Sequence, residues 1–309
     1  MAPQRRGYRW RTVLFVALLI STTNAVAQHP ITIQRDAAAG EYFRALVNFE
    51  KLPKRTVTND ARGAMARSAW ALGLTDRALT EYDRLLREGK LSGPEQSRVL
   101  LARSVIHLQE GRAALSATDA ERAIAFLPLP SALRARAYRV WGDALVANGM
   151  LGSAIAKYER ALSECAEADR TELNLRLGTV LRKLGKLDDA RHFLEQVPLN
   201  TEYTADAIRM LAEVALAQGR PIDAALWLRR GRADYPDTFL DSWVEYVFLR
   251  GAMEQNDRAA VRAARDEAVT RYPPSDYWRT IVEAAAEAFE WQSLMAPVAS
   301  GPIQSAETP

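Results

Sequence analysis

The sequence predicts an all-α protein built as a solenoid of stacked helix-turn-helix units, and three observations lead to this prediction. After residue 27 almost the whole chain shows amphipathic helical patterns rich in Ala, Leu, Arg and Glu, while strand patterns are nearly absent. Glycines recur between these patterns at intervals of 34 to 38 residues. A small residue follows each of these glycines five positions later, as expected where a second helix packs closely on the first.

Residues 1–27 have the pattern of an N-terminal signal peptide. Four arginines and no acid precede the apolar run 13–20, and the segment ends in Ala25-Val26-Ala27, a typical cleavage site. The eight apolar residues of the run cover about 12 Å of helix, well short of the roughly 30 Å hydrocarbon core. We therefore expect cleavage after Ala27, with an uncleaved anchor as the less favoured alternative.

Cleavage would leave an exported chain, which we expect to be soluble in the periplasm and to have no transmembrane span. Secretion and a signal-anchored form are the less favoured locations. The only cysteine, Cys165, lies far from the apolar run, so neither a lipid anchor at that run nor an internal disulfide is expected. Without residues 1–27 the chain carries 37 basic and 38 acidic side chains. This balance does not favour nucleic acid as a partner.

Residues 28–58 are expected to form an N-terminal capping helix region. Within it, residues 41–52 have the pattern of a second-type helix, with Ala45 at the small position and Phe49 at the aromatic one. A terminal helix of this kind would shield the apolar side of the first repeat.

Residues 59–274 are expected to hold about six helix-turn-helix repeats. The central turn residues are five glycines and, in the last repeat, an asparagine: Gly73, Gly111, Gly149, Gly185, Gly219 and Asn256. The small residues that follow are Ala78, Ser116, Ala154, Ala190 and Ala224. An apolar or aromatic residue often lies one helical turn further along the same face, at Tyr82, Tyr158, Leu194 and Leu228.

The third and fourth repeats resemble the tetratricopeptide-repeat family. That family has a period of about 34 residues and pairs a Leu-Gly in the first helix with small and aromatic residues in the second. Here the third repeat has Trp141-Gly142 and Tyr158, and the fourth has Leu177-Gly178 followed by Pro198. The resemblance implies a right-handed solenoid whose first helices line an inner groove. Repeats one, two and six depart from the pattern, with Met65-Ala66, Arg103-Ser104, Phe248-Leu249 and Val261 at the key positions.

Residues 275–295 are expected to form a C-terminal capping helix with Ser275 as its N-cap. Its apolar positions would cover the open side of the last repeat, which would otherwise face water. Residues 296–309 contain three prolines and a glycine and no apolar period, so a disordered tail is expected there.

No catalytic or metal-binding pattern emerges, so we expect a protein that is not an enzyme and that holds no cofactor. The histidines His29, His107 and His192 have no convincing partners, and motifs for zinc, nucleotide or hydrolase chemistry are missing. Cys165 lies among acidic residues, which disfavour the thiolate that a nucleophile needs. It is expected to be inert.

The resemblance implies that the chain binds partner proteins through the groove. Carried over by register, the groove positions include seven arginines and three aromatic residues: Arg67, Trp70, Arg98, Arg136, Arg139, Arg182, Arg209, Trp243, Tyr246 and Arg250. Five acids share this register, namely Asp60, Asp143, Glu172, Asp206 and Glu213, so the positive bias is mild. Aromatic residues also gather in the last third of the chain, where an exposed subset would make an alternative contact surface.

Two short segments, 234–238 and 271–275, resemble the Tyr-Pro junctions of bacterial envelope repeat proteins. We therefore expect a protein–protein interaction scaffold or adaptor in the bacterial cell envelope. The alternative is an accessory helical-repeat domain that assists a glycan- or peptide-processing enzyme of the envelope.

Overall fold

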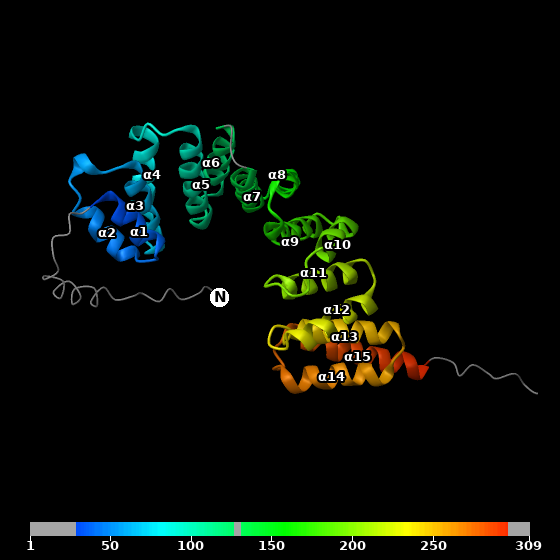
Figure 1. Cartoon of the computed structure of the whole chain (residues 1–309). Coiled ribbons are helices and arrows are strands. Elements are labelled where there is room, and N and C mark those ends of the chain that lie inside the picture. Colours follow the sequence, from blue (N-terminus) through cyan, green and yellow to red (C-terminus); the bar gives the residue numbers. More distant parts are fainter. Residues whose placement is uncertain (1–28, 127–130, 296–309) are drawn as a thin grey trace, which may run out of the picture. The chain divides into compact units, whose positions relative to one another are not determined.

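The computed structural model describes residues 29–126 and 131–295, which form helices and no strand (Figure 1). The signal peptide expected over 1–27 and the tail expected over 296–309 lie outside the described residues. The chain divides into two compact units, residues 1–99 and 100–309, and the boundary falls within helix α5 (Gly93–Gln109). Among the described residues, no helix combines the length and the apolar character needed to cross a membrane.

The first unit contains two helical pairs and a short 3-10 turn: α1 (Pro30–Ala38), α2 (Tyr42–Glu50), η1 (Lys54–Thr56), α3 (Asn59–Ala71) and α4 (Thr75–Glu88). Its core includes Ile33 of α1, Ala45 of α2 and Ala61 of α3, all inaccessible to solvent. The region expected to hold one capping helix therefore holds a complete pair. The turn between α1 and α2 is Gly40, with φ +78° and 33 residues before Gly73, and sequence analysis did not recognise it as part of the series.

The second unit contains the end of α5 and ten further helices within its described residues, which are α6 (Ala113–Ala125), α7 (Ser131–Ala147), α8 (Leu151–Glu164), α9 (Glu167–Lys183), α10 (Leu187–Glu195), α11 (Thr204–Ala217), α12 (Pro221–Asp234), α13 (Ser242–Glu254), α14 (Arg258–Arg271) and α15 (Tyr277–Met295). Nearly all packing joins helices that are adjacent in the sequence. We call the first helix of each pair an A helix and the second a B helix. The A helices of this unit are α7, α9, α11 and α13.

The turns inside the pairs share one backbone geometry. Gly149, between α7 and α8, has φ +76°; its N–H donates to the carbonyl of Val146, and the N–H of Met150 donates to that of Leu145. These two bonds satisfy carbonyls that the end of the helix leaves unpaired. Asn256, at the equivalent place between α13 and α14, has φ +52°. Sequence analysis therefore aligned Asn256 correctly with the glycines, because asparagine tolerates the left-handed region better than most residues.

Close approach of the A and B helices explains the small residues at fixed positions. A Cβ added at Gly142 would lie 2.5 Å from the ring of Tyr158, and one at Gly178 would lie 2.5 Å from Leu194 Cγ. Ser104 takes the same place in α5, and its hydroxyl donates to the carbonyl of Ser116 at 2.8 Å. The second repeat thus replaces an apolar contact with a hydrogen bond, which is why its sequence departs from the pattern.

The last helix, α15, packs on both α13 and α14 and closes the second unit (Figure 1). It buries Val282, Ala286 and Phe289. Its N-cap is Asp276 and not Ser275: the Asp276 carboxylate accepts a hydrogen bond from the backbone N–H of Arg279 at 2.8 Å. The expected cap was one residue early because Ser and Asp are equally good caps by type.

Candidate partner-binding surface

The residues expected to line a binding groove lie on the A helices. In the second unit, however, most of the expected arginines form ion pairs with carboxylates. Arg139 of α7 contacts Glu172 of α9 at 3.1 Å, and Arg182 of α9 contacts Glu213 of α11 at 3.0 Å. Arg209 of α11 pairs with Asp241, which precedes α13. Each pair joins one A helix to the next. These three arginines therefore help to hold neighbouring repeats together, and their charge is largely compensated.

The first of these pairs belongs to a larger network that sequence analysis missed. Arg176 of α9 donates to Asp143 of α7 at 2.7 Å and to Glu172 at 2.6 Å, and Tyr158 of α8 donates to the same Asp143 oxygen at 2.7 Å. Burial raises the pKa of the Tyr158 hydroxyl, and the nearby Asp143 charge raises it further. Burial is also the largest influence on the pKa of Asp143, which it raises against the opposing effect of Arg176. The network joins three helices and serves packing.

Arg176 was outside the expected set because groove register alone does not select it. Its partners come from α7 and α9, 33 and 4 residues away. The packing of consecutive A helices brings Asp143, the partner 33 residues away, next to Arg176.

Four of the expected arginines remain exposed, namely Arg67 on α3, Arg98 on α5, Arg136 on α7 and Arg250 on α13. None of the four forms an ion pair with another of the residues that the structure describes. The expected aromatic residue Trp70, on α3, is partly buried. Arg67, Trp70 and Arg98 belong to the first compact unit, and Arg136 and Arg250 belong to the second.

An aromatic cluster lies at the end of the second unit, and we define it as Trp243 and Tyr246 of α13 with Tyr277 and Trp278 of α15. The rings of Tyr246 and Trp278 are 4.7 Å apart between centroids, and those of Tyr277 and Trp278 are 5.2 Å apart. Tyr277 is 70% exposed, whereas the other three are partly buried. The aromatic cluster therefore exposes the ring of Tyr277 to solvent, while packing fixes the positions of the other three rings.

Two arginines flank this aromatic cluster. The guanidinium of Arg209 lies 5.4 Å from the centroid of Trp243, and Arg250 donates a hydrogen bond to the Tyr246 hydroxyl at 2.9 Å. Arg250 is thereby oriented without its charge being cancelled. A partner segment with an apolar side chain and a carboxylate would find both kinds of contact here.

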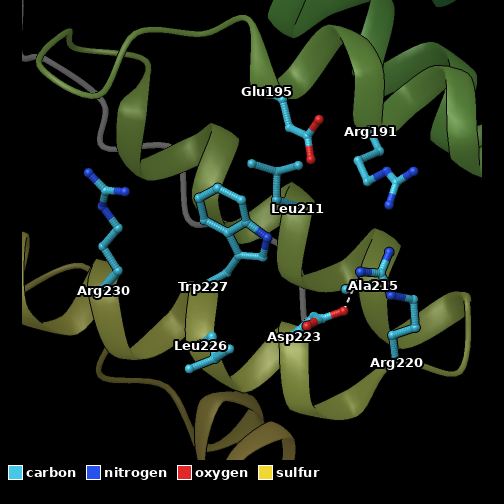
Figure 2. Close-up of a pocket in the computed structure, with 9 residues that line it drawn as sticks. All are labelled: Arg191, Glu195, Leu211, Ala215, Arg220, Asp223, Leu226, Trp227 and Arg230. Carbon is cyan, nitrogen blue, oxygen red and sulfur yellow. Dashed lines mark ion pairs between the residues drawn. The ribbon is translucent and has the colours of Figure 1, made fainter.

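A hollow lies beside the A helix α11, and sequence analysis did not predict it (Figure 2). It has a volume of about 380 Å³ and is bounded by the B helices α10 and α12 and by α11. Its lining residues are Arg191, Glu195, Leu211, Ala215, Arg220, Asp223, Leu226, Trp227 and Arg230. The periodicity of the sequence does not predict this hollow, because its lining comes from three helices and depends on the spacing between two successive helical pairs.

The groups considered for chemistry are placed in packing or surface positions. His107 is buried, with Nε2 3.8 Å from Asp119, and the exposed His192 ring bonds Gln196 at 2.9 Å. The pKa of the Cys165 thiol is raised, first by burial and only secondarily by its acidic neighbours. Within residues 29–126 and 131–295, no group of three His, Cys, Asp or Glu side chains could hold a metal ion.

Comparison with known families finds matches to two tetratricopeptide-repeat models. One matches residues 64–129 and 174–237, and the other matches residues 145–202. Together they cover about half of the chain. A comparison with curated proteins finds no match.

Several solved structures share the fold at low sequence identity. PilF of Pseudomonas aeruginosa is 16% identical, with a TM-score of 0.55, over 74% of this chain and 97% of the other. PilW, described as a widely conserved type IV pilus biogenesis factor, is 15% identical, with a TM-score of 0.55, over 72% of this chain and 98% of the other. A chain of the Cut9–Hcn1 hetero-tetramer of APC/C is 18% identical, with a TM-score of 0.54, over 72% of this chain and 43% of the other.

Proposed function

Because the chain belongs to the tetratricopeptide-repeat family, whose fold is a protein–protein interaction scaffold, we propose that it holds a partner protein in the bacterial cell envelope through its aromatic cluster and Arg250. The observation that carries the choice of surface is the combination of aromatic rings with an arginine that is oriented but not neutralised. Interface hot spots are enriched in Trp, Tyr and Arg. By contrast, Arg139, Arg182 and Arg209 are engaged by carboxylates of the neighbouring repeat.

The envelope location is supported by the signal-peptide pattern of residues 1–27 and by the fold similarity to PilW, a type IV pilus biogenesis factor. The mature protein is then expected to begin at Gln28. Intact-mass analysis of the protein from the periplasmic fraction tests this location. A species that retains residues 13–20 and stays with the membrane fraction would replace the soluble form by an anchored one.

Site-specific photo-cross-linking tests the contact surface directly in cells. A photoreactive amino acid placed at Tyr277 or Arg250 should give one partner adduct, because both side chains are exposed beside the aromatic cluster. Matched control positions are Met150 and Leu115, which are 52% exposed on other helical pairs. Adducts that form equally from the controls, or only from them, would contradict the proposed surface.

A further inference from the structure

We propose that the hollow between α10, α11 and α12, which we call the Trp227 pocket, is a second docking site that binds an extended acidic segment of a partner protein. In this arrangement a large apolar side chain of the segment lies on Trp227, and carboxylates on either side of it pair with Arg191 and Arg230. The inference goes beyond the proposed function because it concerns a different surface and a different set of residues.

The Trp227 pocket is separate from the A-helix surface already described. Leu211 and Ala215 contribute to its lining from α11, whereas Arg209 of the same helix pairs with Asp241. Since each residue turns about 100° around a helix, Arg209 lies about 160° from Leu211 and about 120° from Ala215. A segment in the Trp227 pocket and a partner at the aromatic cluster therefore approach α11 from different sides.

An apolar side chain has a prepared place in the Trp227 pocket. The Trp227 ring packs against core clusters of two successive repeats, so its position is fixed by both. Leu211 and Ala215 are buried beneath the pocket, and Leu226 is 55% exposed at its edge. A volume of about 380 Å³ at a partly exposed tryptophan suits one large side chain together with the backbone that carries it.

The charges of the Trp227 pocket favour acidic groups on both sides of that side chain. Figure 2 shows Arg230 on one side of the indole and Arg191 on the other. Each forms one long ion pair with a partly or largely exposed carboxylate of its own helix, Arg230 with Asp234 at 3.7 Å and Arg191 with Asp188 at 3.9 Å. Such surface pairs are weak and can exchange for a better-placed carboxylate. Arg220 differs because Asp223 already engages it.

Substitution of Glu195 offers a test in which the affinity for an acidic segment should increase. Its side chain lines the Trp227 pocket and forms no ion pair with any residue in the described parts of the chain. A bound acidic segment would be repelled by this carboxylate, so Glu195→Gln should tighten binding. A variant that merely damaged the fold would not do so.

The experiment measures fluorescence anisotropy of a labelled peptide, acetyl-Gly-Asp-Glu-Phe-Asp-Glu-Gly-amide, titrated with the whole mature chain. Arg191→Glu and Arg230→Glu should each weaken binding at least tenfold, and Glu195→Gln should tighten it two- to threefold. Replacing the central Phe of the peptide by Ala should weaken binding at least tenfold. The matched control Arg160→Glu, an exposed charge reversal on the B helix α8, should stay within twofold. Added salt should weaken the wild-type complex.

Three outcomes would overturn the proposal. The first is no binding of the peptide to the wild-type chain at millimolar concentration. The second is unchanged affinity in Arg191→Glu and Arg230→Glu with loss in Trp243→Ala, which would place the peptide at the aromatic cluster. The third is concentration-dependent self-association that Leu226→Glu abolishes, which would make a second copy of the chain the occupant. The cross-linking result at Tyr277 is independent of all three, so the two proposals can fail separately.

Discussion

The ring of Tyr158 lies directly against the backbone of Gly142, leaving no room for a side chain at that position. A Cβ on Gly142 would be 2.5 Å from Tyr158 Cε1, and the hydroxyl of the same ring donates to Asp143 at 2.7 Å. Gly142→Ala should therefore displace the ring and lower the free energy of unfolding by about 1–3 kcal/mol. Urea denaturation followed by circular dichroism measures the change.

Gly152→Ala is the matched control for this overpacking. Gly152 lies in α8 with nothing within 4 Å of an added Cβ, so alanine should raise the free energy of unfolding by up to about 1 kcal/mol through helix propensity. Equal stability of the two variants would mean that the helices do not approach each other as described.

Two tyrosines at the same repeat position should respond oppositely to the loss of their hydroxyl groups. Tyr82 Oη is buried without a hydrogen-bond partner among the described residues, whereas Tyr158 Oη donates to Asp143. Tyr82→Phe should therefore stabilise the protein at pH 7 by about 1 kcal/mol, and Tyr158→Phe should destabilise it by a similar amount. Parallel thermal melts test both. Destabilisation in both variants would imply that Tyr82 has a partner.

Tyr82 should also make the protein sensitive to alkali. Burial raises the pKa of its hydroxyl from 10.0 to about 12. Between these values the unfolded chain loses the proton and the folded chain keeps it, so the free energy of unfolding falls as the pH rises. The loss should reach about 2–3 kcal/mol at pH 12. The difference in stability between wild type and Tyr82→Phe, measured from pH 9 to 12, isolates this contribution, and a constant difference would contradict it.

The left-handed backbone of Asn256 predicts a stabilising change. Glycine adopts φ +52° without the steric cost that other residues meet, so Asn256→Gly should match or exceed the wild-type stability, while Asn256→Val should lose about 1–2 kcal/mol. Chemical denaturation distinguishes these results. A wild-type stability for the valine variant would show that the turn is not left-handed.

Arg136 and Arg139 lie three residues apart on α7 but should tolerate charge reversal differently. Arg136 is exposed, whereas Arg139 is mostly covered and contacts Glu172 at 3.1 Å and Asp143 at 3.5 Å. Arg139→Glu would place a third acid beside these two and should cost about 1–3 kcal/mol. Arg136→Glu should change stability by less than about 0.5 kcal/mol. Melting temperatures of the two single variants measure this, and equal losses would contradict the ion-pair assignment.

The repeat architecture was predictable because its determinants are local. A left-handed turn favours Gly or Asn, and a close helix contact needs a small residue at a fixed offset. Residues such as Gly149 and Ala154 therefore predict the helix-turn-helix repeat. Gly40 was not predicted as the turn of a helical pair because that pair is short and lies outside the best-matching repeats. The prediction of Ser275 as the N-cap was wrong by one residue, because residue type alone does not show which side chain reaches the backbone N–H.

The candidate site was only partly predictable because it depends on contacts between repeats. Register placed Arg139, Arg182 and Arg209 on the A helices, but it could not reveal that carboxylates of the following repeat engage them. The ring contact between Tyr246 and Trp278 joins two helices separated by α14. The Trp227 pocket likewise requires the spacing between α10 and α12, which no single repeat encodes.

Packing that joins mainly consecutive helices in the second unit also has a mechanical consequence. Tension applied along residues 131–295 would meet few contacts between helices that are distant in the sequence, so one helical pair could unfold while the next stays folded. The chain should then lengthen in successive steps of roughly 120 Å as each pair of about 36 residues unfolds. Single-molecule stretching would record a series of unfolding events at low force in place of one rupture at high force.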